Sequence, residues 1–203
     1  EICACLVGSE MCIRDRDSAI KSAFLKGNTK EHILSIYDVQ NISINHEEVI
    51  KIKFEIDTNP PAFAQFENKY RLLPTPYQVK LYDMPSLFAG KLHAVICRAW
   101  KNRVKGRDLY DYVFYLAKQA EVNLPHLRAR LEDSGALSKD EPFTRETLLE
   151  MLNKRFDTID FEQAKQDVLP FITDPCKLDL WSKDFFIDIT KNLQASEEIE
   201  TFS

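Results

Sequence analysis

The 203-residue chain is poor in the residues from which metal and disulfide sites are built. It contains 5 cysteines and 4 histidines, with no C-x-x-C motif and no histidine pair at helical spacing, so we expect no structural zinc site. No apolar run reaches the roughly 18 residues that a membrane-spanning helix needs, so no membrane contact is expected. The sparse cysteines are typical of a protein in the reducing cytoplasm.

Positive charge is also scarce. The chain has 27 Lys and Arg against 32 Asp and Glu, which gives a formal net charge of -5. This balance argues against non-specific binding to polyanions, so any contact with phosphate or nucleic acid has to come from a local basic cluster. A hydrophobic content of 44% and a charged content of 29% are those of a soluble chain that forms a core.

Cysteine is unevenly distributed, because Cys3, Cys5 and Cys12 all lie within residues 1–16. The string LVGSEMCIRDR in this stretch resembles a translated adapter sequence, and the chain starts with Glu1 instead of Met. We therefore expect residues 1–16 to be a non-native artefact and the native amino terminus to be missing.

The remaining sequence predicts strands first and helices afterwards. Residues 49–57 alternate apolar and charged side chains, the period of a strand with one buried face. Further strands are expected at residues 19–25, 33–37 and 77–82. From the capping residue Asp83 onward, helices are expected at residues 85–100, 107–120, 125–137, 144–156, 161–172 and 183–193. This order predicts an α+β fold, with a sheet region at residues 17–82 and a helical region at residues 83–203.

Lys91 lies within an apolar stripe of the first expected helix, alongside Leu87 and Val95. One interpretation is a lysine whose stem runs along the edge of the core while its ammonium reaches solvent. The other is a half-buried ammonium directed at an anion such as a nucleotide phosphate.

A run of basic residues follows, with no acidic residue among them: Arg98, Lys101, Arg103, Lys105 and Arg107. Such runs are usually solvated faces. This one spans the end of one helix and the start of the next, with Gly106 between them. Guanidinium groups and helix amino termini both favour phosphate oxygens, so the run is also a candidate contact for phosphate or RNA.

Asp108 and Asp111 are spaced so that both carboxylates lie on one side of the second helix. They could simply complement the helix dipole, or they could orient a nucleophile or accept its proton. Tyr112 and Tyr115 continue this side and could pack or stack on a base.

The polar side of the strand at residues 49–57 carries Glu55 and Asp57. One interpretation is an ordinary solvent-facing edge. Alternatively, a carboxylate here binds Mg²⁺, the metal that phosphoryl and nucleotidyl transfer commonly use.

These features form one ordered pattern. Residues 84–116 read MPSLFAGKLHAVICRAWKNRVKGRDLYDYVFYL, preceded by KIKFEIDTNPP at residues 51–61 and FENKYRLL at residues 66–73. Over residues 17 to about 135 the chain resembles the AbiEii/AbiGii family of nucleotidyltransferase toxins. The resemblance implies a remnant of a polymerase-β-like nucleotidyltransferase sheet followed by a carboxyl-terminal helical bundle. It also implies a toxin of a type IV toxin–antitoxin or phage abortive-infection system.

The resemblance further implies roles for individual residues. Lys91, Asp108 and Asp111 match catalytic positions of the motif, and Glu55 or Asp57 would be the third carboxylate, a ligand of Mg²⁺. The basic residues Lys105, Arg107 and Arg103 would hold the triphosphate of the NTP substrate. Some members of the family transfer nucleotides to tRNA, and a cognate antitoxin acting on transcription is the implied partner.

The chain departs from the family pattern in one place. A Gly-Ser pair followed by Asp-x-Asp supplies two metal ligands in the family, and nothing in residues 17–48 matches it. Gly8 and Ser9 precede Asp15 and Asp17 at too short a spacing. We therefore expect this chain to be an inactive fragment of an active enzyme. The alternative function is a non-catalytic module that binds RNA or an antitoxin; a metal-dependent nuclease ranks last, because no D…E-x-K arrangement is found.

Overall fold

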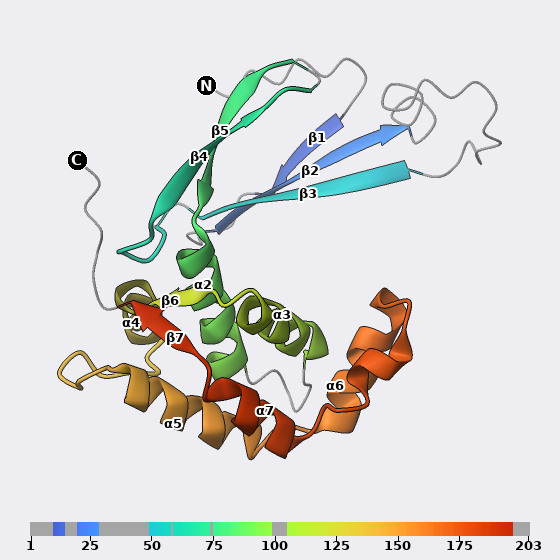
Figure 1. Ribbon diagram of the computed structural model, residues 1–203. Coiled ribbons are helices and arrows are strands. Elements are labelled where there is room, and N and C mark those ends of the chain that lie inside the picture. Colours follow the sequence, from blue (N-terminus) through green and yellow to red (C-terminus); the bar gives the residue numbers. More distant parts are fainter. Residues whose placement is uncertain are drawn as a thin grey trace. The chain divides into compact units, whose positions relative to one another are not determined.

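A computed structural model describes residues 10–14, 20–28, 49–57, 59–73, 75–98 and 105–196, and Figure 1 shows their helices and strands. The chain divides into two compact units, Glu1–Pro60 and Pro61–Ser203. The α+β class predicted from the sequence is confirmed, because both strands and helices are present. No helix in the described part of the chain has the length and apolarity needed to cross a membrane.

The first unit contains an antiparallel sheet of three strands in the order β1-β2-β3. The strands are β1 (Glu10–Arg14), β2 (Ile20–Asn28) and β3 (Val49–Asp57). Ile20 pairs with Asp57 and Asn28 with Val49, so β2 and β3 pair along their whole length. β3 has the bounds predicted from its alternating pattern, whereas the strand predicted at residues 33–37 lies outside the described residues.

The second unit begins with a hairpin of β4 (Phe66–Arg71) and β5 (Tyr77–Tyr82). The predicted bounds of β5 are confirmed, but β4 was not predicted. The boundary expected after residue 82 would group this hairpin with the sheet of the first unit; by its contacts the hairpin belongs with the helices.

Six helices follow in the described residues: α2 (Met84–Cys97), α3 (Gly106–Ala117), α4 (Leu124–Asp133), α5 (Arg145–Phe156), α6 (Phe161–Val168) and α7 (Lys183–Thr190). Two short 3₁₀ helices, Leu169–Phe171 and Pro175–Leu178, lie between α6 and α7. The helical part also contains two strands that were not predicted, β6 (Glu121–Asn123) and β7 (Gln194–Ser196), paired in parallel. The expected order of strands followed only by helices is wrong at these two strands.

Helix starts are fixed by side chains that satisfy free backbone N–H groups. Asp83, the predicted cap of α2, accepts a hydrogen bond from the backbone N of Ser86 at 2.9 Å. Asn123 and Thr144 cap α4 and α5 in the same way. Several helices end earlier than predicted. One reason is visible after α3, where Gln119 has a positive φ of 51°, a conformation that cannot continue the helix.

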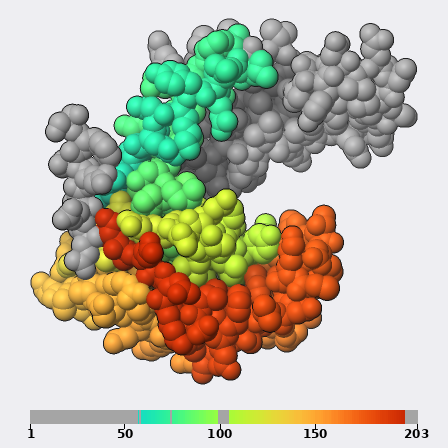
Figure 2. Space-filling view, viewed as in Figure 1, coloured from blue at the N-terminus to red at the C-terminus, as the bar shows by residue number. Residues whose placement is uncertain are grey.

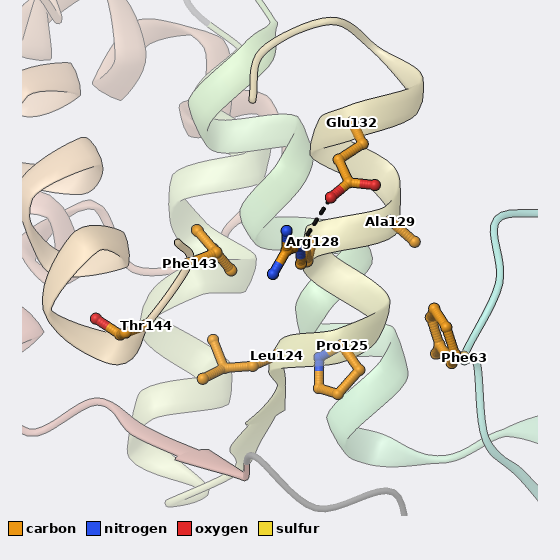
Figure 3. Close-up of a pocket in the computed structure, with 8 residues that line it drawn as sticks. All are labelled: Phe63, Leu124, Pro125, Arg128, Ala129, Glu132, Phe143 and Thr144. Carbon is orange, nitrogen blue, oxygen red and sulfur yellow. Dashed lines mark hydrogen bonds and ion pairs between the residues drawn. The ribbon is translucent and has the colours of Figure 1, made fainter. Parts of the chain in front are cut away.

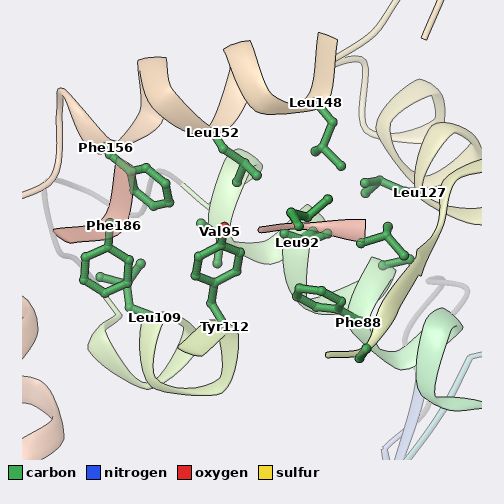
Figure 4. Packing of buried hydrophobic residues seen from close by; sticks show 14 of the residues in the cluster. Phe88, Leu92, Val95, Leu109, Tyr112, Leu127, Leu148, Leu152, Phe156 and Phe186 are labelled. Carbon is green, nitrogen blue, oxygen red and sulfur yellow. The ribbon is translucent and has the colours of Figure 1, made fainter. Parts of the chain in front are cut away.

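The hydrophobic core of the second unit joins all of its long helices (Figure 4). Phe88 and Leu92 of α2 meet Tyr112 of α3, while Leu152 of α5 and Phe186 of α7 close the other side. All five side chains are completely buried. This packing gives α2 and α3 rigid positions, and the candidate site is built on these two helices.

Candidate functional site

Two basic and two acidic side chains meet where α2 packs against α3. The Nζ atom of Lys91 lies 3.0 Å from Oδ1 of Asp108 and 2.7 Å from Oδ2 of Asp111. The second oxygen of Asp108, Oδ2, accepts a hydrogen bond from Nη1 of Arg98 at 2.7 Å. The three predicted catalytic residues Lys91, Asp108 and Asp111 are therefore brought together, and Arg98 completes an ion-pair cluster that we name the α2–α3 cluster.

Helical spacing explains how so few elements build this cluster. Lys91 and Arg98 are two turns apart on α2, so both side chains reach the same neighbour. Asp108 and Asp111 are three residues apart on α3 and share one side of that helix, as predicted. Burial separates them, because the side chain of Asp108 is 7% exposed and that of Asp111 is 45% exposed. Asp108 is thus the buried centre of the cluster.

The carboxylates keep Lys91 charged. Burial lowers the pKa of Lys91, but the hydrogen bonds and the negative charges of Asp111 and Asp108 together outweigh burial and raise the pKa above its ordinary value. The side chain of Lys91 is 25% exposed, and its ammonium lies between the two carboxylates. Leu87 does not belong to a buried stripe of α2, because it is exposed.

Next to Asp108 is a small cavity of about 20 Å³ whose polar lining is Arg98, Lys105, Asp108 and Arg155. Arg155 reaches across from α5, and its guanidinium donates hydrogen bonds to the backbone oxygens of Val95 and Arg98 at 3.1 and 3.2 Å. These oxygens belong to the carboxyl end of α2, where carbonyls lack helical partners. Arg155 therefore holds Arg98 in place, and three cations surround one carboxylate at the cavity, an environment that attracts anions.

The other predicted phosphate-binding residues lie differently. Lys105 lines the cavity and is exposed, as expected for a cation that meets a ligand. Arg107 lies away from the α2–α3 cluster: its Nε is 3.8 Å from Oδ2 of Asp167, and its guanidinium lies 4.8 Å from the centre of the Phe171 ring. Neighbouring residues of a helix project about 100° apart, which is why Asp108 faces α2 while Arg107 faces α6. Arg103 lies outside the described residues.

The candidate metal ligands belong to the first unit. Glu55 and Asp57 lie at the end of β3, where Glu55 pairs with Ser22 and Asp57 with Ile20. Asp57 is exposed, and its Oδ1 accepts a hydrogen bond from the backbone N of Asn59 at 3.0 Å. Carboxylate oxygens are ligands that Mg²⁺ prefers, so either residue has the chemistry of a divalent-metal ligand. Their role stays a prediction.

The α2–α3 cluster itself does not fit a metal. Asp108 and Asp111 are already paired with cations, which compete with a metal for the same oxygens. Among the side chains that the structure describes, no group of three His, Cys, Asp or Glu residues could hold a metal ion. We therefore derive no metal-dependent step at this cluster.

Tyr112 and Tyr115 resolve the choice between packing and base stacking. Tyr112 is fully buried, and its hydroxyl lies 2.6 Å from Oγ1 of Thr190, so the ring packs in the core. Tyr115 stacks on Phe88 with 4.9 Å between ring centres. Stacking of Tyr112 on a base is excluded by its burial.

A larger cavity of about 480 Å³ lies elsewhere in the second unit, against α4 (Figure 3). It is lined mainly by apolar side chains, among them Phe63, Leu124 and Phe143. Its charged residues Arg128 and Glu132 pair with one another at 2.7 Å. None of the predicted site residues lines it, so we do not assign the predicted chemistry to this cavity.

Sequence reasoning missed one residue of the site, Arg155. It lies 47 positions after Asp108 on a helix that the sequence predicted correctly, but a single arginine in an amphipathic helix carries no functional signal. Only the packing of α5 on α2 shows that it reaches the site.

A comparison with known protein families matches most of the chain. The sequence model of a family described as nucleotidyl transferase AbiEii toxin, type IV TA system, matches residues 11–189. The match spans every residue of the α2–α3 cluster as well as Glu55 and Asp57. A search among curated proteins found no match.

Proposed function

Because the chain belongs to the AbiEii family of nucleotidyl transferase toxins of type IV toxin–antitoxin systems, we propose that its α2–α3 cluster is the part of a nucleotidyl transfer site that binds the triphosphate and positions the acceptor. The family implies an NTP substrate, a divalent metal and an antitoxin partner. We further propose that the acceptor is tRNA, that the antitoxin acts on transcription, and that the toxin acts in the cytoplasm in defence against phage.

The observation that carries this proposal is the buried carboxylate of Asp108, held between Lys91 and Arg98. A carboxylate with both oxygens fixed by cations cannot rotate away, so it offers a defined position from which to orient an acceptor hydroxyl. Its oxygens each keep a lone pair for a further hydrogen bond. Asp108 would thereby position the attacking hydroxyl, directly or through a water molecule.

The cations around Asp108 supply the triphosphate half of the site. Lys91, Arg98, Lys105 and Arg155 outnumber Asp108 and Asp111 by four to two. The surplus of positive charge at the cavity favours phosphate oxygens and lowers the energy of the charge that develops during transfer. The ammonium of Lys91 donates two of its three N–H groups to the carboxylates of Asp108 and Asp111, and the third is available to a phosphate oxygen.

We propose the metal site separately, on β3 of the first unit. A divalent ion, in our proposal Mg²⁺ at Glu55 or Asp57, supplies polarisation of the α-phosphate when it is bound. Every other contribution proposed here comes from the side chains of α2, α3 and α5.

Binding of NTP tests the proposal. Each fluorescently labelled NTP would be titrated into the chain and into variants Lys91→Met and Lys154→Met, the latter an exposed lysine on α5 as matched control. Loss of one charge-assisted contact, worth about 2 kcal/mol, weakens binding roughly thirtyfold in Lys91→Met. The control should bind as the unaltered chain does. Equal binding by Lys91→Met and the unaltered chain contradicts the proposed role of the cluster.

Whether the chain transfers the nucleotide of a bound NTP is a separate question from NTP binding. Because residues 17–48 contain no Gly-Ser…Asp-x-Asp motif, we propose that this chain binds NTP without transferring it. The measurement is label transfer from each α-labelled NTP to total tRNA in the presence of Mg²⁺. If label is transferred, the inactivity proposal is wrong, and Asp108→Asn is then expected to abolish transfer while NTP binding is kept.

A further inference from the structure

The β4–β5 hairpin carries aromatic, amide and basic side chains that the α2–α3 cluster does not use. In a two-stranded hairpin, directly paired residues share a face and neighbouring residues alternate between faces. The pairs are Phe66 with Tyr82, Asn68 with Lys80 and Tyr70 with Gln78. We name these six residues the aromatic face of the hairpin.

The composition of the aromatic face is unlike that of the chain. It has three aromatic rings, two amides and one lysine, and it has no carboxylate, although Asp and Glu outnumber Lys and Arg by 32 to 27 in the chain. The opposite face contains Glu67, which pairs with Lys69 at 2.7 Å, together with Val79 and Leu81. The opposite face thus holds the half-buried aliphatic residues, one acid and two cations, Lys69 and Arg71. The aromatic face has no acid and presents three rings and one cation.

The rings of the aromatic face are accessible, and the face is held in place. Tyr70 is 74% exposed and Phe66 is 49% exposed. Tyr82 stacks on Phe66 with 4.8 Å between ring centres, and its other neighbour is His126 of α4 at 6.2 Å. Lys80 lies 4.6 Å from the centre of the Phe66 ring. Figure 2 shows the hairpin in teal and green at the surface of the second unit.

A hollow of about 830 Å³, with both apolar and polar lining, opens at the foot of this face beside Phe66. Its polar lining contains one lysine, Lys80, and three carboxylates, those of Glu67, Asp83 and Glu121, together with the amides of Gln65, Asn68 and Asn123. Side-chain amides and carboxylates are the groups that hydrogen-bond the edges of nucleobases. The hollow is therefore suited to an unpaired base that lies beside the Phe66 ring.

We propose that the aromatic face and this hollow bind single-stranded RNA. Exposed rings stack on unpaired bases, lysines contact the phosphate backbone, and amides read base edges. A duplex cannot use the rings, because its bases are already stacked on one another. The inference rests on the proposed function, in that the RNA bound here would be the acceptor of the nucleotide.

The experiment compares the two faces of one hairpin. Binding of fluorescently labelled RNA of about ten nucleotides, a length that an aromatic groove can hold, would be measured by anisotropy, for the single strand and for the duplex of the same sequence. The double variant Tyr70→Ala/Lys80→Ala changes the aromatic face. Its matched control, Tyr77→Ala/Lys69→Ala, removes the same residue types from the opposite face.

We expect the unaltered chain to bind the single strand more tightly than the duplex. One stacked base contributes roughly 1–3 kcal/mol, so Tyr70→Ala/Lys80→Ala should weaken binding by at least about tenfold. The control double variant should keep its affinity. Tyr70→Phe retains the aromatic ring and should also keep the RNA affinity. This variant shows whether weaker binding comes from lost stacking or from an altered hairpin structure.

Equal weakening by the two double variants, a preference for the duplex, or no RNA binding by the unaltered chain would each overturn the proposal. NTP binding by the same variants separates this result from the proposed function. Hairpin variants are expected to bind NTP normally, and Lys91→Met is expected to bind RNA normally. If Lys91→Met retains NTP affinity while the aromatic face still binds RNA, the proposed function fails and this inference stands.

Discussion

At the scale of single residues, neighbouring carboxylates of one helix take different roles. Asp108 and Asp111 look equivalent in the sequence, and both contact Lys91. Asp108 is buried and has a second cation, Arg98, whereas Asp111 is at the solvent edge. A buried charge requires compensation that an exposed one obtains from water. Asp108 therefore depends on the cluster more than Asp111 does, and we place the positioning role on it.

The raised pKa of Lys91 predicts how stability depends on pH. The hydrogen bonds to Asp111 and Asp108 outweigh burial and raise the pKa in the folded chain above the ordinary value of about 10.4. A raised pKa of a lysine means that the stabilisation is complete below the ordinary pKa and is lost as the pH rises through the folded pKa. Urea unfolding of the unaltered chain and of Lys91→Met should therefore differ by a constant free energy up to about pH 10 and converge above it.

Tyrosines and other lysines titrate in both proteins, so their contributions cancel in this difference. Convergence that begins between neutral pH and pH 9 or so would mean that burial dominates and the pKa is lowered instead.

At the scale of elements, local patterns predicted the position of most helices and strands. β3 and β5 have the bounds predicted at residues 49–57 and 77–82, and α5 begins after its cap Thr144. β4, β6 and β7 were missed because their pattern is not local. β4 has no buried side that would produce an alternating pattern. β6 and β7 have three residues each, and they pair although they are far apart in the sequence. Their strand conformation depends on the partner.

Gly106 joins two elements by close approach. A Cβ atom at this position would lie 1.9 Å from the backbone oxygen of Ala164 and 2.8 Å from Cγ2 of Val168, both on α6. Gly106→Ala therefore forces α3 and α6 apart. We expect a loss of about 3 kcal/mol or more in the free energy of unfolding, measured by urea denaturation.

The matched control is Gly90→Ala in α2. There the added Cβ would meet only the end of the flexible Arg130 side chain, at 3.6 Å. Alanine is the better helix former, so this variant should be more stable by about 0.5–1 kcal/mol. Similar destabilisation by both substitutions would show that the close approach of α3 to α6 is not the reason why position 106 requires glycine.

At the scale of the whole molecule, the helical part carries its own core. The buried hydrophobic side chains of the second unit lie between Phe88 and Leu193. The α2–α3 cluster, the cavity beside it and the aromatic face all lie in this unit too. The predicted metal ligands Glu55 and Asp57 lie in the first unit.

This division predicts that residues 61–203 fold alone. We expect the isolated segment to show the helical circular dichroism of the second unit and a cooperative thermal transition, because the buried core that joins its helices lies within the segment. It should also bind NTP through Lys91 with the affinity of the complete chain. A segment that unfolds without a cooperative transition would contradict the division into independent units.

The sequence by itself determined the α+β class, the family, the choice of Lys91, Asp108 and Asp111 as candidates, and the placement of both carboxylates on one side of a helix, because helical periodicity and the KLHA…KGRDLYD motif are properties of neighbouring residues. Tertiary structure decided which cations share the site. It turned Arg107 toward Asp167, brought Arg155 from α5 to the end of α2, and buried Tyr112 in the core. These outcomes depend on how helices distant in sequence pack together, and a packing contact leaves no period in either of the segments that make it.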